Sequence, residues 1–95
     1  NNAFQGTVSV VKTEKVIVST GSGDLEASLG EDIKLSVGDE AIVFARPEAM
    51  SIVKRNNTIK NVLNSKVVYQ EFEGNFWHLI LDLKNGMKIK MSQIN

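Results

Sequence analysis

The sequence predicts an all-β fold with little or no helix, and two observations support it. Short runs of alternating apolar and polar residues are separated by Gly, Asn, Asp and Ser at close intervals, which is typical of strands joined by turns. Helical periodicity is almost absent, and the best helical candidate, residues 55–61, is rich in Asn. Small β units that cannot cover their own edges tend to close on each other. We therefore expect a β-barrel or sandwich.

The expected strands follow one another along the whole chain, each bounded by turn-forming residues. Their apolar residues recur at every second position, which puts one face of each strand toward a core. They cover residues 4–11, 15–20, 24–28, 32–36, 40–46, 49–54, 61–72, 76–83 and 87–92.

The last hairpin can be predicted in register. A two-residue turn at Asn85-Gly86 would set Leu83 opposite Lys88, whereas a three-residue loop, 84–86, sets Leu83 opposite Met87. The longer loop also pairs Leu81 with Ile89, Leu79 with Met91 and, on the outer face, Asp82 with Lys88. It keeps the apolar residues on one face, and it places Gly86 at the left-handed position of a bulged turn.

Internal repetition suggests that one domain, residues 1–95, is built from two related β units. Residues 2–8 and 61–67 share the frame Asn-x-apolar-x-small-x-Val. Residues 35–44 and 83–91 share a Leu-x-x-Gly that leads into an alternating strand. We expect units of about 1–48 and 61–95, joined by a linking strand over 49–60.

Composition limits the classes of function. The chain has 95 residues, enough for one core, with 11 basic and 11 acidic side chains and therefore no formal net charge. Duplex nucleic acid and anionic membranes favour a basic excess, so neither is an expected partner. There are no cysteines, which excludes disulfides and thiolate metal sites. The start at Asn1, without an initiator Met, suggests a piece of a longer protein.

Reactive constellations are scarce. Neither phosphate-binding glycine motif occurs, and the single His and absent Cys make a zinc site improbable on composition. Glu71, Glu73 and Asp82 fit solvated strand ends better than a catalytic pair. His78 fits a half-exposed strand position. Four other candidates fit core positions: Trp77, Met50, Met87 and Met91. Some basic character comes from Lys12, Lys15, Lys54, Arg55 and Lys60, but no aromatic residues are interleaved with them, as they usually are in a groove that binds single strands.

The only proline lies between opposite charges, in Arg46-Pro47-Glu48. A catalytic Glu48 would need a raised pKa, which a nearby Arg opposes. A structural corner between two strands needs no shifted pKa. Pro47 cannot donate a ladder hydrogen bond, fixes its own φ and holds Arg46 extended, so it belongs at a strand end. We predict a corner with Arg46 and Glu48 as orienting charges.

These motifs together resemble the TOBE domain, the oligonucleotide-binding-like β domain at the C-terminus of ATP-binding subunits of many ABC importers. The resemblance follows the family's order: the Asn frame at 2–8, "LSVGDEAIVFARPEAMSI" at 35–52, the second frame at 61–67, Phe72-Glu73-Gly74, and the Asn85-Gly86 hairpin. Ser65 stands where the second repeat of the family usually has Gly. The matching family positions are Gly38, Asp39, Arg46, Pro47, Glu48, Asn61, Gly74 and Gly86.

The resemblance implies an OB-like, non-catalytic accessory and regulatory domain. In the family, ATP and Mg are bound by an upstream domain, so no cofactor is expected in these 95 residues. The implied partners are a second copy of the ATPase subunit and, through the parent protein, a transmembrane permease. The implied location is the cytoplasm, peripheral to the inner face of the membrane.

Two other functions stay open. One is a module similar to the Mop modules, which would bind an oxyanion such as molybdate or tungstate through backbone N–H groups, hydroxyls and a Lys. The other is an OB-fold nucleic-acid binder, which the zero net charge and the lack of aromatic residues among the basic ones disfavour.

Overall fold

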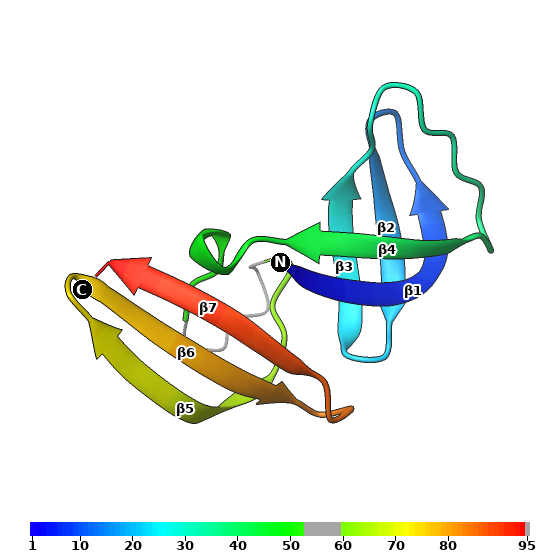
Figure 1. The fold of residues 1–95 in the computed structure, drawn as a ribbon. Coiled ribbons are helices and arrows are strands. Elements are labelled where there is room, and N and C mark those ends of the chain that lie inside the picture. Colours follow the sequence, from blue (N-terminus) through cyan, green and yellow to red (C-terminus); the bar gives the residue numbers. More distant parts are fainter. Residues whose placement is uncertain (53–59, 95) are drawn as a thin grey trace.

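The chain forms two antiparallel β-sheets, shown in Figure 1. The computed structural model describes residues 1–52 and 60–94. The first sheet has the order β3-β2-β1-β4, and the second has the order β5-β6-β7. The all-β prediction is confirmed, and the two sheets are consistent with an OB-like sandwich. The elements are β1 (Asn2–Val11), β2 (Lys15–Thr20), β3 (Gly23–Ser28), β4 (Glu40–Ala45), the 3-10 turn η1 (Pro47–Ala49), β5 (Ser65–Glu73), β6 (Phe76–Leu83) and β7 (Lys88–Ile94).

Two expected strands are absent from the described residues. Residues 32–36 form no strand: the chain turns as Ile33 N–H donates to the Gly30 carbonyl, and Leu35 packs its side chain against the first sheet. The strand expected over 49–54 is not formed either. Residue 49 is the last residue of η1, and residues 50–52 are not in a strand. Residues 53 and 54 lie outside the described residues. An alternating pattern cannot distinguish a ladder strand from a loop that docks single apolar side chains.

The segment between the sheets also differs from the expectation. The strand expected from residue 61 begins only at Ser65, and Asn61 has a positive φ of 59°, which is incompatible with a strand. Most of the helical candidate at 55–61, and residues 53–59 of the expected linking strand, lie outside the described residues.

The predicted hairpin register is confirmed. Leu81 pairs with Ile89, Leu79 with Met91 and Asp82 with Lys88. The Leu83 N–H donates to the Met87 carbonyl at 2.8 Å, and Gly86 has φ +83°. Gly86 thus takes the left-handed position, which glycine adopts without a steric cost.

The first three strands of the chain and the last three have the same arrangement. Each set is a meander, and the two registers correspond: Val8 pairs with Val18 as Val67 pairs with Leu81. Each first strand also carries an irregularity just after these valines, between Val8 and Val10 and between Val67 and Tyr69. β1, β2 and β3 therefore correspond to β5, β6 and β7.

The second sequence match, Leu-x-x-Gly, leads into strands that do not correspond. β4 lies beside β1, whereas β7 lies at the far side of β6. Within the described residues, β4 consequently has no counterpart in the second sheet.

A shared hydrophobic core joins the sheets. Phe4 and Leu25 from the first sheet pack with Leu79, Leu81 and Ile89 from the second, and Phe4 is only 2% exposed. Met91 is buried in this cluster, and Met50 and Met87 pack against it, so the predicted core role of the methionines is confirmed. A smaller cluster around Val8, Val16 and Val18 lies within the first sheet.

We predict that Gly6→Ala destabilises the fold by about 1–3 kcal/mol, the usual cost of overpacking. A Cβ at residue 6 would lie 2.3 Å from the backbone oxygen of Ser19, which cannot move without disturbing the β1–β2 ladder. Urea denaturation would measure the change. Ser65→Ala is the matched control, because Ser65 holds the corresponding position and already has a Cβ. Equal stability of Gly6→Ala and the wild type would contradict the prediction.

Candidate functional site

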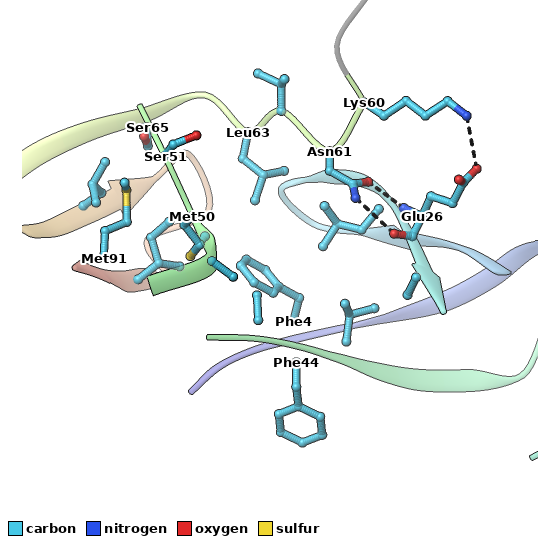
Figure 2. Close-up of a pocket in the computed structure, with 18 of the residues that line it drawn as sticks. Phe4, Glu26, Phe44, Met50, Ser51, Lys60, Asn61, Leu63, Ser65 and Met91 are labelled. Carbon is cyan, nitrogen blue, oxygen red and sulfur yellow. Dashed lines mark hydrogen bonds and ion pairs between the residues drawn. The ribbon is translucent and has the colours of Figure 1, made fainter. Parts of the chain in front are cut away.

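A half-open cleft of about 930 Å³ lies between the two sheets (Figure 2). Its floor is the shared core, and its walls come from β3, β4, the segment after η1 and residues 60–65. The lining is mainly apolar, with Phe4, Leu25, Leu63, Leu81, Ile89 and Met91 among its residues. Such a composition suits an apolar group or a peptide segment better than a charged metabolite.

Two asparagines bind the backbone of the opposite sheet in the same way. Asn2 donates through Nδ2 to the Lys90 carbonyl and accepts through Oδ1 from the Lys90 N–H, both at 2.8 Å. Asn61 makes the same pair of bonds with Glu26, at 3.0 Å and 2.7 Å, as Figure 2 shows. Asn2 and Asn61 open the two repeated sequence frames. The repeat therefore encodes a reciprocal contact between the sheets.

The two asparagines differ in burial. Asn2 is 6% exposed, and its Nδ2 also lies 3.1 Å from the Met50 sulfur, whereas Asn61 lies at the rim of the cleft and is exposed. Unpaired polar groups are costly mainly when buried. Asn2 is therefore the stronger stabilising contact.

The carboxylate of Glu26 forms ion pairs with three lysines. Lys12 Nζ lies 2.8 Å from its carboxylate, Lys15 3.7 Å and Lys60 3.6 Å. The hydrogen bond from Lys12 lowers the pKa of Glu26, and the charges of the three lysines act in the same direction. These three lysines, noted in the sequence for their basic character, are thus engaged around one carboxylate. Lys54 and Arg55 lie outside the described residues.

Gly38 and Asp39 fix the start of β4 against β1. Gly38 has φ +95° and donates its N–H to the Val8 carbonyl, and the Asp39 carbonyl accepts from the Val8 N–H, both at 2.8 Å. The Asp39 carboxylate accepts from the Ser36 N–H at 2.8 Å. The structure places both residues in backbone-fixing positions.

Pro47 stands at the end of β4, as expected for a corner. It begins η1, and Arg46 before it is extended, with φ −75° and ψ 142°. Arg46 and Glu48 take part in none of the ion pairs found among the described residues. Their orienting role stays a prediction.

The remaining candidates lie on β6 or in the turns at its ends, and none of them lines the cleft. Gly74, with φ +58°, and Gly86 lie in turns at opposite ends of β6. Trp77 packs against the core, and its ring stacks on that of Phe72 with the ring centroids 6.0 Å apart. His78, half-buried, hydrogen-bonds Ser92 at 2.9 Å.

The suspected carboxylates also have separate partners. Glu71 hydrogen-bonds Tyr69 and raises the pKa of its hydroxyl, and Asp82 pairs with Lys88. Within residues 1–52 and 60–94, no cluster of three or more His, Cys, Asp or Glu could hold a metal ion. The described part of the chain also contains no helix long and apolar enough to span a membrane.

Neither the role of Glu26 nor the cleft is predictable from the sequence. Glu26 lies in a stretch without a motif, and its partners come from three different places in the chain. Asn2 and Asn61 carried a signal, the repeated frame, but only the structure shows which backbone each one binds.

The fold and the cleft define a small all-β module, in which a shared core and two asparagine side chains hold two sheets together. The chain is 30% identical over 94 residues to the spermidine/putrescine import ATP-binding protein PotA of Fusobacterium nucleatum subsp. nucleatum. The match covers 95% of this chain and 25% of that relative, so the chain corresponds to a quarter of a longer protein. No protein-family model and no solved structure matches the chain.

We predict that Asn2→Ala lowers the free energy of unfolding by about 1–3 kcal/mol, because it leaves the N–H and carbonyl of Lys90 without partners in a part-buried site. Asn61→Ala should lower the free energy of unfolding by less, because Asn61 is exposed, once the cost of placing Ala at a positive φ has been subtracted. Asn61→Gly, which tolerates the positive φ, allows that subtraction. Chemical denaturation measures each variant, with exposed Asn64→Ala as control. An Asn2→Ala protein as stable as this control would contradict a stabilising contact between Asn2 and Lys90.

Glu26→Gln should make the protein less stable at neutral pH, with a difference that disappears on acidification. The lowered pKa means that Glu26 stabilises the fold above its unfolded-state pKa, near 4.3, and that this contribution is lost as the pH falls through the lower folded value. Melting temperatures of wild type and variant from about pH 2 to 7 measure the convergence. Exposed Glu31→Gln is the control, and a difference independent of pH would count against the ion cluster.

Proposed function

We propose that the chain is a non-catalytic accessory domain, of the TOBE type, of the ATP-binding subunit of an ABC importer. In this role it stabilises the dimer of ATPase subunits and relays regulation to it. The observation that carries the proposal is the similarity, over nearly the whole chain, to a quarter of an import ATP-binding protein. Spermidine and putrescine, the substrates in the name of that relative, are the first cargo to test for the parent transporter.

Two features of the chain support an accessory role. The sequence has neither of the glycine motifs that bind phosphates, so ATP and Mg would be bound by another domain of the parent protein. Three polar residues that line the cleft, Glu26, Lys60 and Asn61, are engaged with one another in holding the fold. The chain therefore offers surfaces to partners: a second subunit, and a permease through the parent protein at the cytoplasmic side of the membrane.

The first test is the gene that contains these 95 codons. We expect an upstream phosphate loop in the same reading frame, and ATP–Mg binding by the full-length product that calorimetry does not detect for the 95-residue chain. Hydrolysis of ATP by the chain alone would refute the proposal. So would a reading frame that encodes this domain without a nucleotide-binding domain.

A second test concerns the corner after β4. In the full-length subunit, Glu48→Gln should weaken dimerisation by about twofold to fivefold, the range of one exposed charge contact. Pro47→Ala should act in the same direction by loosening η1. Analytical ultracentrifugation measures the dimer, with exposed Glu31→Gln as the control. Loss of some activity of the isolated, folded chain in these variants would point to a reactive site instead.

The same preparation separates the two other functions. Calorimetry with molybdate and sulfate tests an oxyanion module, and heat of binding with molybdate would favour it over the accessory role. Titration with labelled single-stranded nucleic acid at low salt tests the nucleic-acid binder, which requires salt-dependent binding.

A further inference from the structure

Met50 is placed differently from the other two methionines. It follows η1 directly, is half-buried and lines the cleft (Figure 2). Met91 also lines the cleft but is only 3% exposed, because it belongs to the buried core. Met87 is half-buried beside the β6–β7 turn, away from the residues that line the cleft. Met50 therefore combines access from the cleft with contact to the core.

The sulfur of Met50 has a defined partner. Asn2 donates to it through Nδ2 at 3.1 Å, and the same side chain makes both of its hydrogen bonds with the backbone of Lys90. Among the hydrogen bonds between described residues, this is the one that a methionine sulfur accepts. A thioether sulfur is a weak acceptor with two lone pairs. One lone pair of Met50 thus faces Asn2, and the other is left for reaction.

We propose that Met50 is an oxidation site, at which a hydroperoxide converts the thioether to a sulfoxide and thereby weakens the contact between Asn2 and β7. The free lone pair of the sulfur attacks a peroxide oxygen, so that an S–O bond forms as the O–O bond breaks. The proton on the transferred oxygen passes to the leaving oxygen, which departs as water or an alcohol. Sulfur is oxidised by two electrons and the peroxide is reduced by two.

The sulfoxide fits the place of the thioether poorly. Met50 packs against the shared core, and Nδ2 of Asn2 already lies 3.1 Å from the sulfur. A sulfoxide is polar and chiral, and it disrupts apolar packing. Oxidation therefore moves the side chain of Met50 out of the core and uncovers Asn2, which is 6% exposed in the reduced protein. Water then competes for the hydrogen bonds between Asn2 and Lys90.

The same contact controls the stereochemistry of the reaction. A sulfoxide has two epimers, one for each lone pair of the thioether. The side chain of Asn2 blocks the approach of a peroxide to the lone pair that faces it. The folded protein should therefore form mainly one epimer at Met50.

The first measurement is the rate at which hydrogen peroxide oxidises each methionine of the 95-residue chain, followed by peptide mass spectrometry. Met50 should react at least about tenfold faster than the buried Met91, because susceptibility follows exposure. The two rates should become equal in the chain unfolded by urea. A folded protein in which Met50 reacts as slowly as Met91 would overturn the proposal.

The second measurement is the ratio of the two epimers at Met50. Peptides from the digested protein are treated with the two methionine sulfoxide reductases, each of which reduces one epimer. One epimer should be in about fivefold or greater excess after oxidation of the folded chain, and the two should be equal after oxidation of the unfolded chain. Asn2→Asp, which removes the amide donor and keeps an acceptor for the Lys90 N–H, should reduce the excess. Equal epimers from the folded wild type would refute the role of Asn2.

The third measurement separates Met50 from the other methionines. Peroxide treatment should lower the urea midpoint of the wild type and speed solvent exchange of the Lys90 amide about threefold or more. Met50→Leu conserves the side-chain volume without an oxidisable sulfur, so it should keep both values after the same treatment. An equal loss in Met50→Leu would assign the effect to Met87 or Met91 and contradict the proposal. None of these measurements involves ATP, so their outcome is independent of the proposed role in transport.

Discussion

Two asparagine side chains take the place of strand pairing between the two sheets. Across the described residues no strand of one sheet pairs with a strand of the other, so the directional contacts that relate them are few. An asparagine amide offers one donor and one acceptor, as a peptide group does, and can therefore complete the hydrogen bonding of a strand edge. Asn2 does this for β7 and Asn61 for β3. The shared core supplies most of the burial, but apolar contacts alone would not fix the register of one sheet against the other.

The sequence allowed prediction where the governing contacts are local. The register of the β6–β7 hairpin follows from the alternation of Leu81 and Leu83 with Asp82 and from the conformation of Gly86. The end of β4 follows from the fixed φ of Pro47. The prediction failed where alternation has another cause: Leu35 docks onto the first sheet from a loop, and Asn61 leaves the strand conformation to reach Glu26. Neither contact partner is close in sequence, so no local pattern reports it.

The cleft shows how such distant contacts create a candidate binding site. Its walls are brought together by the Asn61–Glu26 contact on one side and by the packing of η1 beside β7 on the other. None of the family-motif residues except Asn61 lines it. Gly38, Gly74 and Gly86 instead fix turns, which are requirements of the fold rather than of a ligand. A motif shared with a family can thus describe the frame of a domain without describing what the domain binds.

The two asparagine contacts also affect how the chain folds. The bonds of Asn2 join residues 88 positions apart, and those of Asn61 join residues 35 apart. Each meander can form from neighbouring strands, but the two can be locked together only after a loop comprising most of the chain has closed. Closing such loops costs chain entropy before the asparagine hydrogen bonds can form and offset that cost. Proteins of this topology therefore fold slowly, on the order of milliseconds to seconds. The two meanders are therefore expected to form early and to dock late, so that the N-terminal strand is fixed only when the C-terminal strand is in place.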